Sequence, residues 1–69
     1  MEFLEVRFHE SRPVIIDDHE QGKTNLVIEL AGGLHTISLG GKGSVFSPLQ
    51  QTVFINNTNV VSPYVVSFT

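Results

Sequence analysis

Apolar and polar side chains alternate with a period of two along most of this 69-residue chain. In the first run, Leu4, Val6 and Phe8 alternate with Glu5 and Arg7. Similar alternation recurs within residues 14–16, 25–30, 36–39, 49–55 and 64–68. Alternation over short runs is typical of half-buried β-strands, and the runs are rich in the β-branched and aromatic residues that favour strands. No stretch of a dozen residues combines a period of 3.6 with helix caps, so the sequence predicts an all-β fold.

Turn-forming residues separate these runs at short intervals. They are Ser11–Pro13, Gln21–Gly22, Gly32–Gly33, Gly40–Gly43, Pro48, Asn56–Asn57 and Ser62–Pro63. This spacing predicts a small antiparallel β-sandwich or a partly open barrel of about six to seven short strands. Residues 1–69 are expected to form a single β domain, because a chain of this length has room for only one.

Gly32–Gly33 gives the strongest local prediction. The pair lies between the alternating runs 25–30 and 34–39. A two-residue hairpin loop needs positive φ, which glycine adopts without steric cost, so we expect a β-hairpin here. We assign Gly22, Gly32 and Gly33 as structural turn residues.

The composition limits the partners of this chain. A domain of this size has a small core, and there is no cysteine with which to cross-link it. The net charge is −3 and the basic residues are scattered, so no nucleic acid is expected as a partner. No apolar run approaches the ~20 residues of a membrane helix, so no membrane insertion is expected. Localisation stays open: cytoplasmic if Met1 is the native start, extracytoplasmic if the chain is a fragment of a larger protein.

Charge is unevenly distributed along the chain. Six of the seven acidic residues lie between Glu2 and Glu20, whereas residues 43–69 contain no Asp, Glu, Lys or Arg. That half is either a strand-rich segment with an uncharged solvent face or a contact surface, because charge is depleted at the centre of interfaces. Gln50–Ile55 and Tyr64–Phe68 are β-prone and free of proline, and we expect one of them to be an open sheet edge covered by a partner. The candidate interface residues are Gln50, Thr52, Phe54, Tyr64, Val65 and Val66.

Gly22-Lys23-Thr24 matches the end of a phosphate-binding loop, but its surroundings do not match. The pattern requires a glycine five residues before Gly22, where this chain has Asp17. Asp18 and Glu20 add further negative charge, which disfavours a polyphosphate. The following segment is expected to be a strand rather than the helix whose N-terminus would bind the anion. No cofactor is therefore expected.

The acidic segment Asp17–Gly22 superficially matches a calcium loop, with an acid at its first position and glycine at its sixth. Its twelfth position, which needs a bidentate glutamate, is Ile28. We therefore favour a solvated acidic turn between two strands. Asp17 with His19 is a better pair for a transition metal, but two ligands alone make only a weak site, and no metal is assigned.

The histidines form no catalytic motif. His9 lies beside Glu10 at a strand end, and His35 is expected to be a packed, hydrogen-bonded side chain. No nucleophile motif is present, so we expect no enzyme and no catalytic residues. A small metal-dependent enzyme built on His9, Asp17 and His19 ranks last among the alternatives.

Part of the chain, residues 14–39, resembles PEGA domains. The positions that match their pattern are Gly22, Thr24, Leu30, Gly33, His35 and Ile37. Asp18 and Asn25 replace a glycine and a proline of that pattern, and Ala31–Gly32 replaces the Pro-Glu of its name-giving turn. PEGA domains are small β-sandwich modules, usually appended to bacterial and archaeal envelope or signalling proteins. The resemblance implies a non-catalytic module for protein or polysaccharide contact.

These observations predict a non-enzymatic interaction module that binds protein through its surface or a sheet edge and self-associates as a dimer. The alternative is a carbohydrate-binding module of an envelope or secreted protein. Such a module usually presents an aromatic platform, and this chain has no tryptophan and a single tyrosine, Tyr64. Phe46 and Phe54 are the other candidates for that platform.

Overall fold

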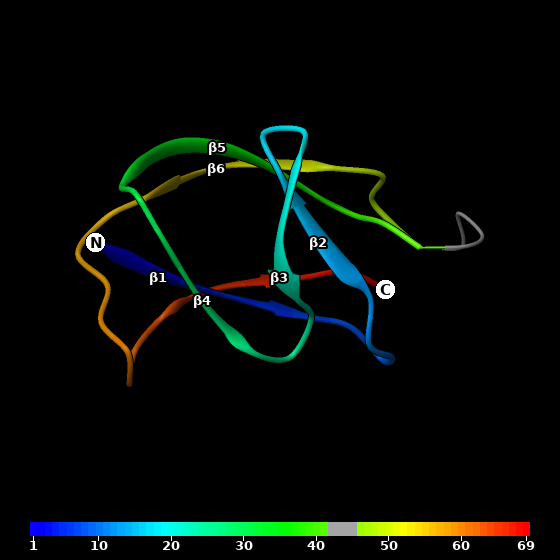
Figure 1. Cartoon of the computed structure of the whole chain (residues 1–69), viewed down its shortest axis with the longest axis horizontal. Helices are drawn as coiled ribbons and strands as arrows, with labels where there is room; N and C mark the ends of the chain where they lie inside the picture. Colours follow the sequence, from blue (N-terminus) through cyan, green and yellow to red (C-terminus); the bar gives the residue numbers. More distant parts are fainter. Residues whose placement is uncertain (42–45) are drawn as a thin grey trace.

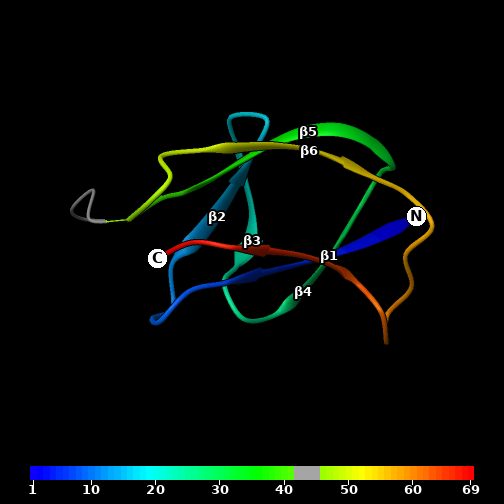
Figure 2. The same ribbon diagram turned by 180° about the vertical axis from the view of Figure 1, so that it is seen from behind.

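The computed structural model describes residues 1–41 and 46–69, which form seven β-strands and no helix (Figure 1). The strands are β1 (Glu2–Arg7), β2 (Pro13–Ile16), β3 (His19–Lys23), β4 (Val27–Leu30), β5 (Gly33–Leu39), β6 (Gln51–Ile55) and β7 (Tyr64–Ser67). One sheet has the order β4-β1-β7 and the other the order β3-β2-β5-β6 (Figures 1 and 2). The predicted all-β sandwich of short strands is confirmed. Within the described residues, no helix of the length and hydrophobicity needed to cross a membrane is present.

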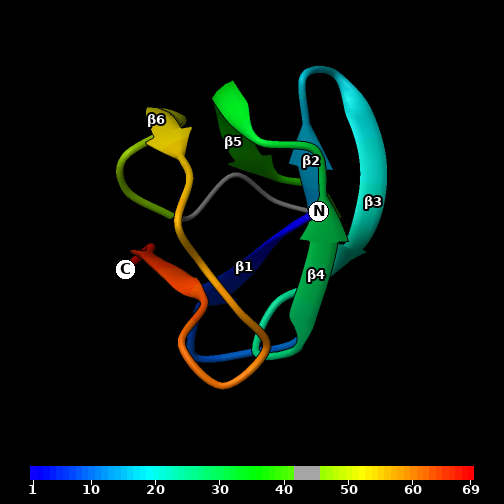
Figure 3. The same cartoon turned by 90° about the vertical axis from the view of Figure 1, so that its left-hand side faces the viewer.

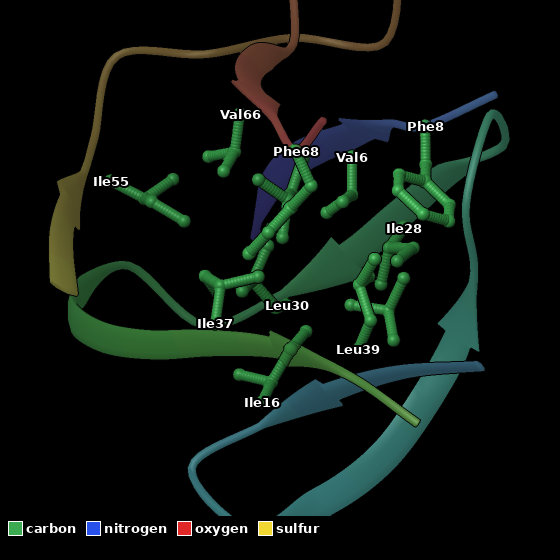
Figure 4. Close-up of a cluster of buried hydrophobic side chains, with 12 residues drawn as sticks. Val6, Phe8, Ile16, Ile28, Leu30, Ile37, Leu39, Ile55, Val66 and Phe68 are labelled. Atoms are coloured by element: carbon green, nitrogen blue, oxygen red, sulfur yellow. The ribbon is translucent and has the colours of Figure 1, made fainter. Parts of the chain in front are cut away.

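Among the described residues, twelve buried hydrophobic side chains form the cluster through which the two sheets pack (Figure 4). Its members are Leu4, Val6, Phe8, Val14, Ile16, Ile28, Leu30, Ile37, Leu39, Ile55, Val66 and Phe68. Burial of each such side chain contributes roughly 1.5–3 kcal/mol relative to exposure, so this cluster is the main source of stability. The alternation predicted the cluster well, with Leu26 and Leu49 as exceptions. Both are exposed, by 62% and 69%, because each lies outside the strand that its run forms.

The hairpin predicted at Gly32–Gly33 is wrong. β4 pairs with β1, whereas β5 pairs with β2 and β6, so the link between β4 and β5 crosses from one sheet to the other. Gly33 nevertheless has the predicted positive φ, at 123°. A strand-glycine-strand pattern specifies a sharp change of direction, but it does not specify which strands pair afterwards.

A two-residue hairpin loop occurs instead at Asp17–Asp18. Ile16 pairs with His19 across it, and the two aspartates have φ values of 50° and 70°. Positive φ at both loop positions is the type I′ geometry that matches strand twist, and aspartate tolerates it better than most residues. The acidic turn is therefore tighter than predicted, and it is followed by a strand, β3. That strand contributes no side chain to the core, so its sequence carries no alternating hydrophobic signal.

One strand pair departs from the predicted antiparallel arrangement. β7 runs parallel to β1, with Glu5 opposite Val65 and Val6 opposite Val66. The other strand pairs of the described residues are antiparallel. Period-two alternation identifies the buried face of β7. The same alternation occurs in parallel and in antiparallel strands, so it cannot predict which way β7 runs relative to β1.

Candidate interaction edge

Thr24, the last residue of the phosphate-loop match, has a structural role. Its side chain is buried, and its hydroxyl donates to the carbonyl of Glu10 at 2.7 Å and accepts from the N–H of Arg12 at 2.9 Å. Gly22 lies against Ile28, because a Cβ at Gly22 would be 2.8 Å from Ile28 Cγ1. The segment after Thr24 leads into strand β4. These bonds join the loop between β3 and β4 to the segment between β1 and β2, and they give the hydroxyl two internal partners.

Asp17, from the predicted acidic turn, binds β5. Its Oδ1 accepts from the N–H of Thr36 at 2.9 Å, and its Oδ2 lies 2.6 Å from Nδ1 of His35. His35 Nε2 lies 2.8 Å from the carbonyl of Ala31, which can only accept. Both ring nitrogens can donate at once only in the protonated ring, so this geometry favours the imidazolium form of His35. His35 is hydrogen-bonded, as predicted.

The Asp17–His35 pair shifts both titrations. The hydrogen bond to Asp17 raises the pKa of His35, against a smaller opposing effect of burial. The pKa of Asp17 is lowered, first by the Thr36 N–H and then by His35. No group of three or more metal-ligating side chains comes together in residues 1–41 and 46–69. The charge of His19 makes only the smallest of the contributions that lower the pKa of Asp17.

The aromatic side chains do not share one surface. Phe46 packs edge-on against Phe8 and Phe68, with ring centroids 6.3 Å and 5.9 Å apart, beside the core. Phe54 is exposed on β6 and Tyr64 is partly exposed on β7, in the other sheet. Phe46 is thus partly buried against the core and does not lie on one platform with Phe54 and Tyr64.

The two candidate interface segments are both edge strands on the same side of the sandwich. β6 ends the four-stranded sheet and β7 ends the three-stranded sheet, and Figure 3 shows them together on one side. β3 and β4 form the opposite side. Of the predicted interface residues, Gln50, Thr52, Phe54, Tyr64 and Val65 are at least partly exposed. Val66 is wrong as a contact residue, because its side chain points into the core and is 3% exposed.

The backbone of β5 shows which of its residues bond to β6. The N–H of Gly40 donates to the carbonyl of Pro13, and the N–H of Asp17 donates to the carbonyl of Thr36, both at 2.9 Å. Even-numbered residues of β5 therefore face β2. Because backbone groups alternate between the two edges of an antiparallel strand, the odd-numbered residues face β6.

The open edge of β6 follows from this alternation. The odd-numbered residues of β5 pair with Gln51, Val53 and Ile55. Thr52 and Phe54 consequently direct their N–H and C=O groups away from β5, to the open edge. Within the described part of the chain these four groups have no hydrogen-bond partner. Thr52 and Phe54 also expose their side chains.

The edge of β7 is partly covered. The N–H of Phe68 donates to the carbonyl of Arg7 in β1, so Val65 and Ser67 direct their backbone groups to the open edge. The carbonyl of Ser67 accepts from Nε2 of Gln51 at 2.7 Å. This bond joins the start of β6 to the end of β7.

The segment before β6 covers the chain beyond β7. Ser47 and Thr69 exchange two backbone hydrogen bonds, of 2.7 Å and 2.9 Å. Within the described part of the chain, the N–H and C=O of Val65 and the N–H of Ser67 have no hydrogen-bond partner at this edge. β7 thus leaves three backbone groups open and β6 leaves four, so β6 is the more open of the two edges.

Apolar side chains lie beside the open edge of β6. Leu34 stands directly opposite Phe54 on the outer face, and the two are 67% and 59% exposed. The next pair on this face is Thr36 and Thr52, whose hydroxyl oxygens lie 3.3 Å apart. Leu34 was missed in the sequence analysis. The sequence did contain a signal for it: Leu34 lies an odd number of residues before Ile37 and Leu39, so it belongs to the opposite, solvent-facing side of the strand.

Charged side chains distinguish the opposite side of the sandwich. β3 carries Glu20 and Lys23, and β4 carries Glu29. Charges on edge strands are a common way of preventing unwanted strand pairing. β6 and β7 carry none, so the domain has one protected side and one unprotected side.

Comparison with protein-family profiles, with curated proteins and with solved structures gave no match for this chain.

Proposed function

We propose that this chain is a non-enzymatic protein-interaction module that accepts an extended segment of another polypeptide along the open edge of β6. The observation that carries the proposal is the pair Thr52 and Phe54, whose four edge-facing backbone groups have no partner among residues 1–41 and 46–69. They lie on a strand without charged residues, beside exposed Leu34. Addition of a strand to an open sheet edge is a recurrent mode of peptide recognition. The partial resemblance to PEGA domains supports the same class of function.

The expected affinity follows from the groups that the edge offers. Each backbone hydrogen bond contributes a net of about 0.5–1.5 kcal/mol, and the edge offers four groups. Burial of Phe54 and Leu34 would add to this, because both side chains are mostly exposed. The cost of ordering the incoming segment offsets much of the gain. We therefore expect dissociation constants on the order of micromolar, with preference for apolar or β-branched side chains at alternate positions.

A displayed library of random heptapeptides, selected against the whole chain at about 10 µM, tests the proposal. Binding of a selected peptide should shift and protect the amide signals of Thr52 and Phe54. Thr52→Lys should weaken binding at least tenfold, because it places a charge on the edge. Gln21→Lys adds the same charge to exposed Gln21 on β3 and should leave binding unchanged.

Three outcomes would contradict the proposal. The first is that the library yields no binder even at millimolar peptide. The second is that selected peptides bind Thr52→Lys as tightly as the unchanged chain. The third is that their amide shifts lie on strands other than β5 and β6.

A further inference from the structure

We infer that the polypeptide segment that fits this edge is β6 of a second copy of the same chain, paired antiparallel about a two-fold axis. The inference rests on the proposed function, because it names the occupant of the same edge. Two copies related in this way join their four-stranded sheets into one continuous sheet. Each copy presents the identical surface, which is the isologous arrangement of most homodimers.

Charge favours a second copy as the partner. In symmetric pairing every residue near the axis approaches its own counterpart, so a charged edge repels itself. No Asp, Glu, Lys or Arg occurs in residues 43–69, which include the whole of β6. Glu20 and Lys23 belong to β3 and Glu29 belongs to β4. These two strands lie on the opposite side of the sandwich (Figure 3). Two copies with a net charge of −3 can therefore pair through β6 without bringing charged residues of that strand together. The carboxylate of Glu2, near the end of β6, is bound by the N–H and the hydroxyl of Thr58.

The alternation of backbone groups fixes the register. Residues of β6 that direct their N–H and C=O groups to the open edge must face residues of the same kind in the second copy. Only these residues have backbone groups that are not already bonded to β5. The register that overlaps the whole strand, Gln51 to Ile55, places Val53 on the axis. Thr52 then faces Phe54 of the second copy, and Phe54 faces its Thr52. Full overlap and hydrogen bonding thus select the same register.

The side chains are compatible with that register. Thr52 and Phe54 lie on the outer face, where Thr36 and Leu34 are their neighbours on β5. Across the axis, each Phe54 ring would lie beside Thr52 of the other copy. Leu34 would lie on the other side of the ring. An exposed Leu–Phe pair would be partly buried in each copy without the entry of any charge.

The dimer should be weak. Pairing of one five-residue strand buries less surface than the ~1,200 Å² at which specific stable interfaces begin. We expect a dissociation constant on the order of 100 µM. Sedimentation equilibrium of the whole chain from about 10 µM to 1 mM measures it, and amide signals of β6 should shift with concentration over the same range.

Matched variants identify the edge. Thr52→Lys and Phe54→Lys should each raise the dissociation constant at least tenfold, while Gln21→Lys on β3 should not change it. Melting temperatures close to that of the unchanged chain verify that the variants are folded. The register has a separate test, because the chain has no native cysteine. An equimolar mixture of Thr52→Cys and Phe54→Cys should form mixed disulfides in preference to either homodisulfide, since Cα atoms of a hydrogen-bonded pair lie about 5.5 Å apart.

Different results separate this inference from the proposed function. A chain that is monomeric at 1 mM but still binds selected peptides at β6 overturns self-pairing and leaves the proposed function intact. A chain that neither dimerises nor binds peptides overturns both. Dimerisation that Thr52→Lys and Phe54→Lys leave unchanged overturns the assignment of this edge. Homodisulfides formed as readily as mixed disulfides overturn the register.

Discussion

The glycines Gly22 and Gly33 provide a sharp test of how backbone conformation and side-chain packing act separately on stability. Both have positive φ, at 152° and 123°. A Cβ at Gly33 would meet no atom within 4 Å, whereas a Cβ at Gly22 would lie 2.8 Å from Cγ1 and 2.9 Å from Cδ1 of Ile28. Alanine at Gly33 therefore adds only backbone strain, while alanine at Gly22 adds strain and a steric clash with a core residue.

The magnitudes follow from these distances. Positive φ in a residue with a Cβ costs about 1–3 kcal/mol, and we expect Gly33→Ala to destabilise by about 1–2 kcal/mol. Gly33→Val should cost more than ~1 kcal/mol, because a β-branched residue is especially strained there. Gly22→Ala must also displace Ile28, which is buried, at a cost typical of overpacking, about 1–3 kcal/mol. Gly22→Ala should therefore destabilise by roughly 3 kcal/mol in total.

Thermal and urea unfolding of the three variants measure these differences. One kcal/mol corresponds to a change of about 4–8 °C in melting temperature for a domain of this size. Combining Gly22→Ala with Ile28→Val, which removes Cδ1 but keeps Cγ1, should relieve part of the clash and destabilise less than the sum of the two single changes. An unchanged melting temperature for Gly33→Val would refute the strain argument. Equal losses for Gly22→Ala and Gly33→Ala would refute the role of the Ile28 contact.

Three further predictions concern the interior and the Asp17–His35 pair. Thr24→Val should destabilise by about 1–3 kcal/mol in urea unfolding, because it removes the buried hydroxyl that bonds the carbonyl of Glu10 and the N–H of Arg12; a loss below a few tenths of a kcal/mol would contradict this. Ile37→Ala, at a fully buried position, should lower the free energy of unfolding by about 2–5 kcal/mol in the same measurement. A loss as small as that of a substitution at an exposed position would show that Ile37 is not buried in the core. The Asp17–His35 pair should stabilise the fold most between the ordinary pKa values of Asp and His, 3.8 and 6.5, because the pKa of Asp17 is lowered and that of His35 is raised. Stability should fall as the pH rises through the raised pKa of His35 or falls through the lowered pKa of Asp17, and an Asp17→Asn variant with the same pH profile as the unchanged chain would exclude this contribution.

Local patterns in the sequence determined the fold class and most of the core. Alternation identified the buried positions of six strands, because the side chains of a strand point to opposite faces whatever it pairs with. The positive φ of Gly33 also follows locally, since glycine has no Cβ to oppose it. The sequence did not predict β3, because its side chains do not enter the core and its sequence therefore has no hydrophobic alternation.

The sequence also indicated the candidate edge, but only in part. The absence of charge in residues 43–69 pointed to β6 and β7 as uncovered strands, and both are edge strands. Alternation cannot show which residues direct their backbone to the edge, because that depends on the partner strand. The assignment of Thr52 and Phe54 needed the register with β5, and the exclusion of Val66 needed its position in the core.

Tertiary structure alone decided which strands are neighbours. β4 joins β1 rather than β5, and β7 runs parallel to β1, although neither pairing has a local signal. These choices depend on how the buried faces of strands distant in sequence fill one core, and that is a property of the whole chain. The same choices bring β6 and β7 to one side and leave the charged strands β3 and β4 on the other (Figure 3). The sequence therefore determined that an uncharged edge exists, and the packing of the two sheets determined where it lies and which backbone groups it offers.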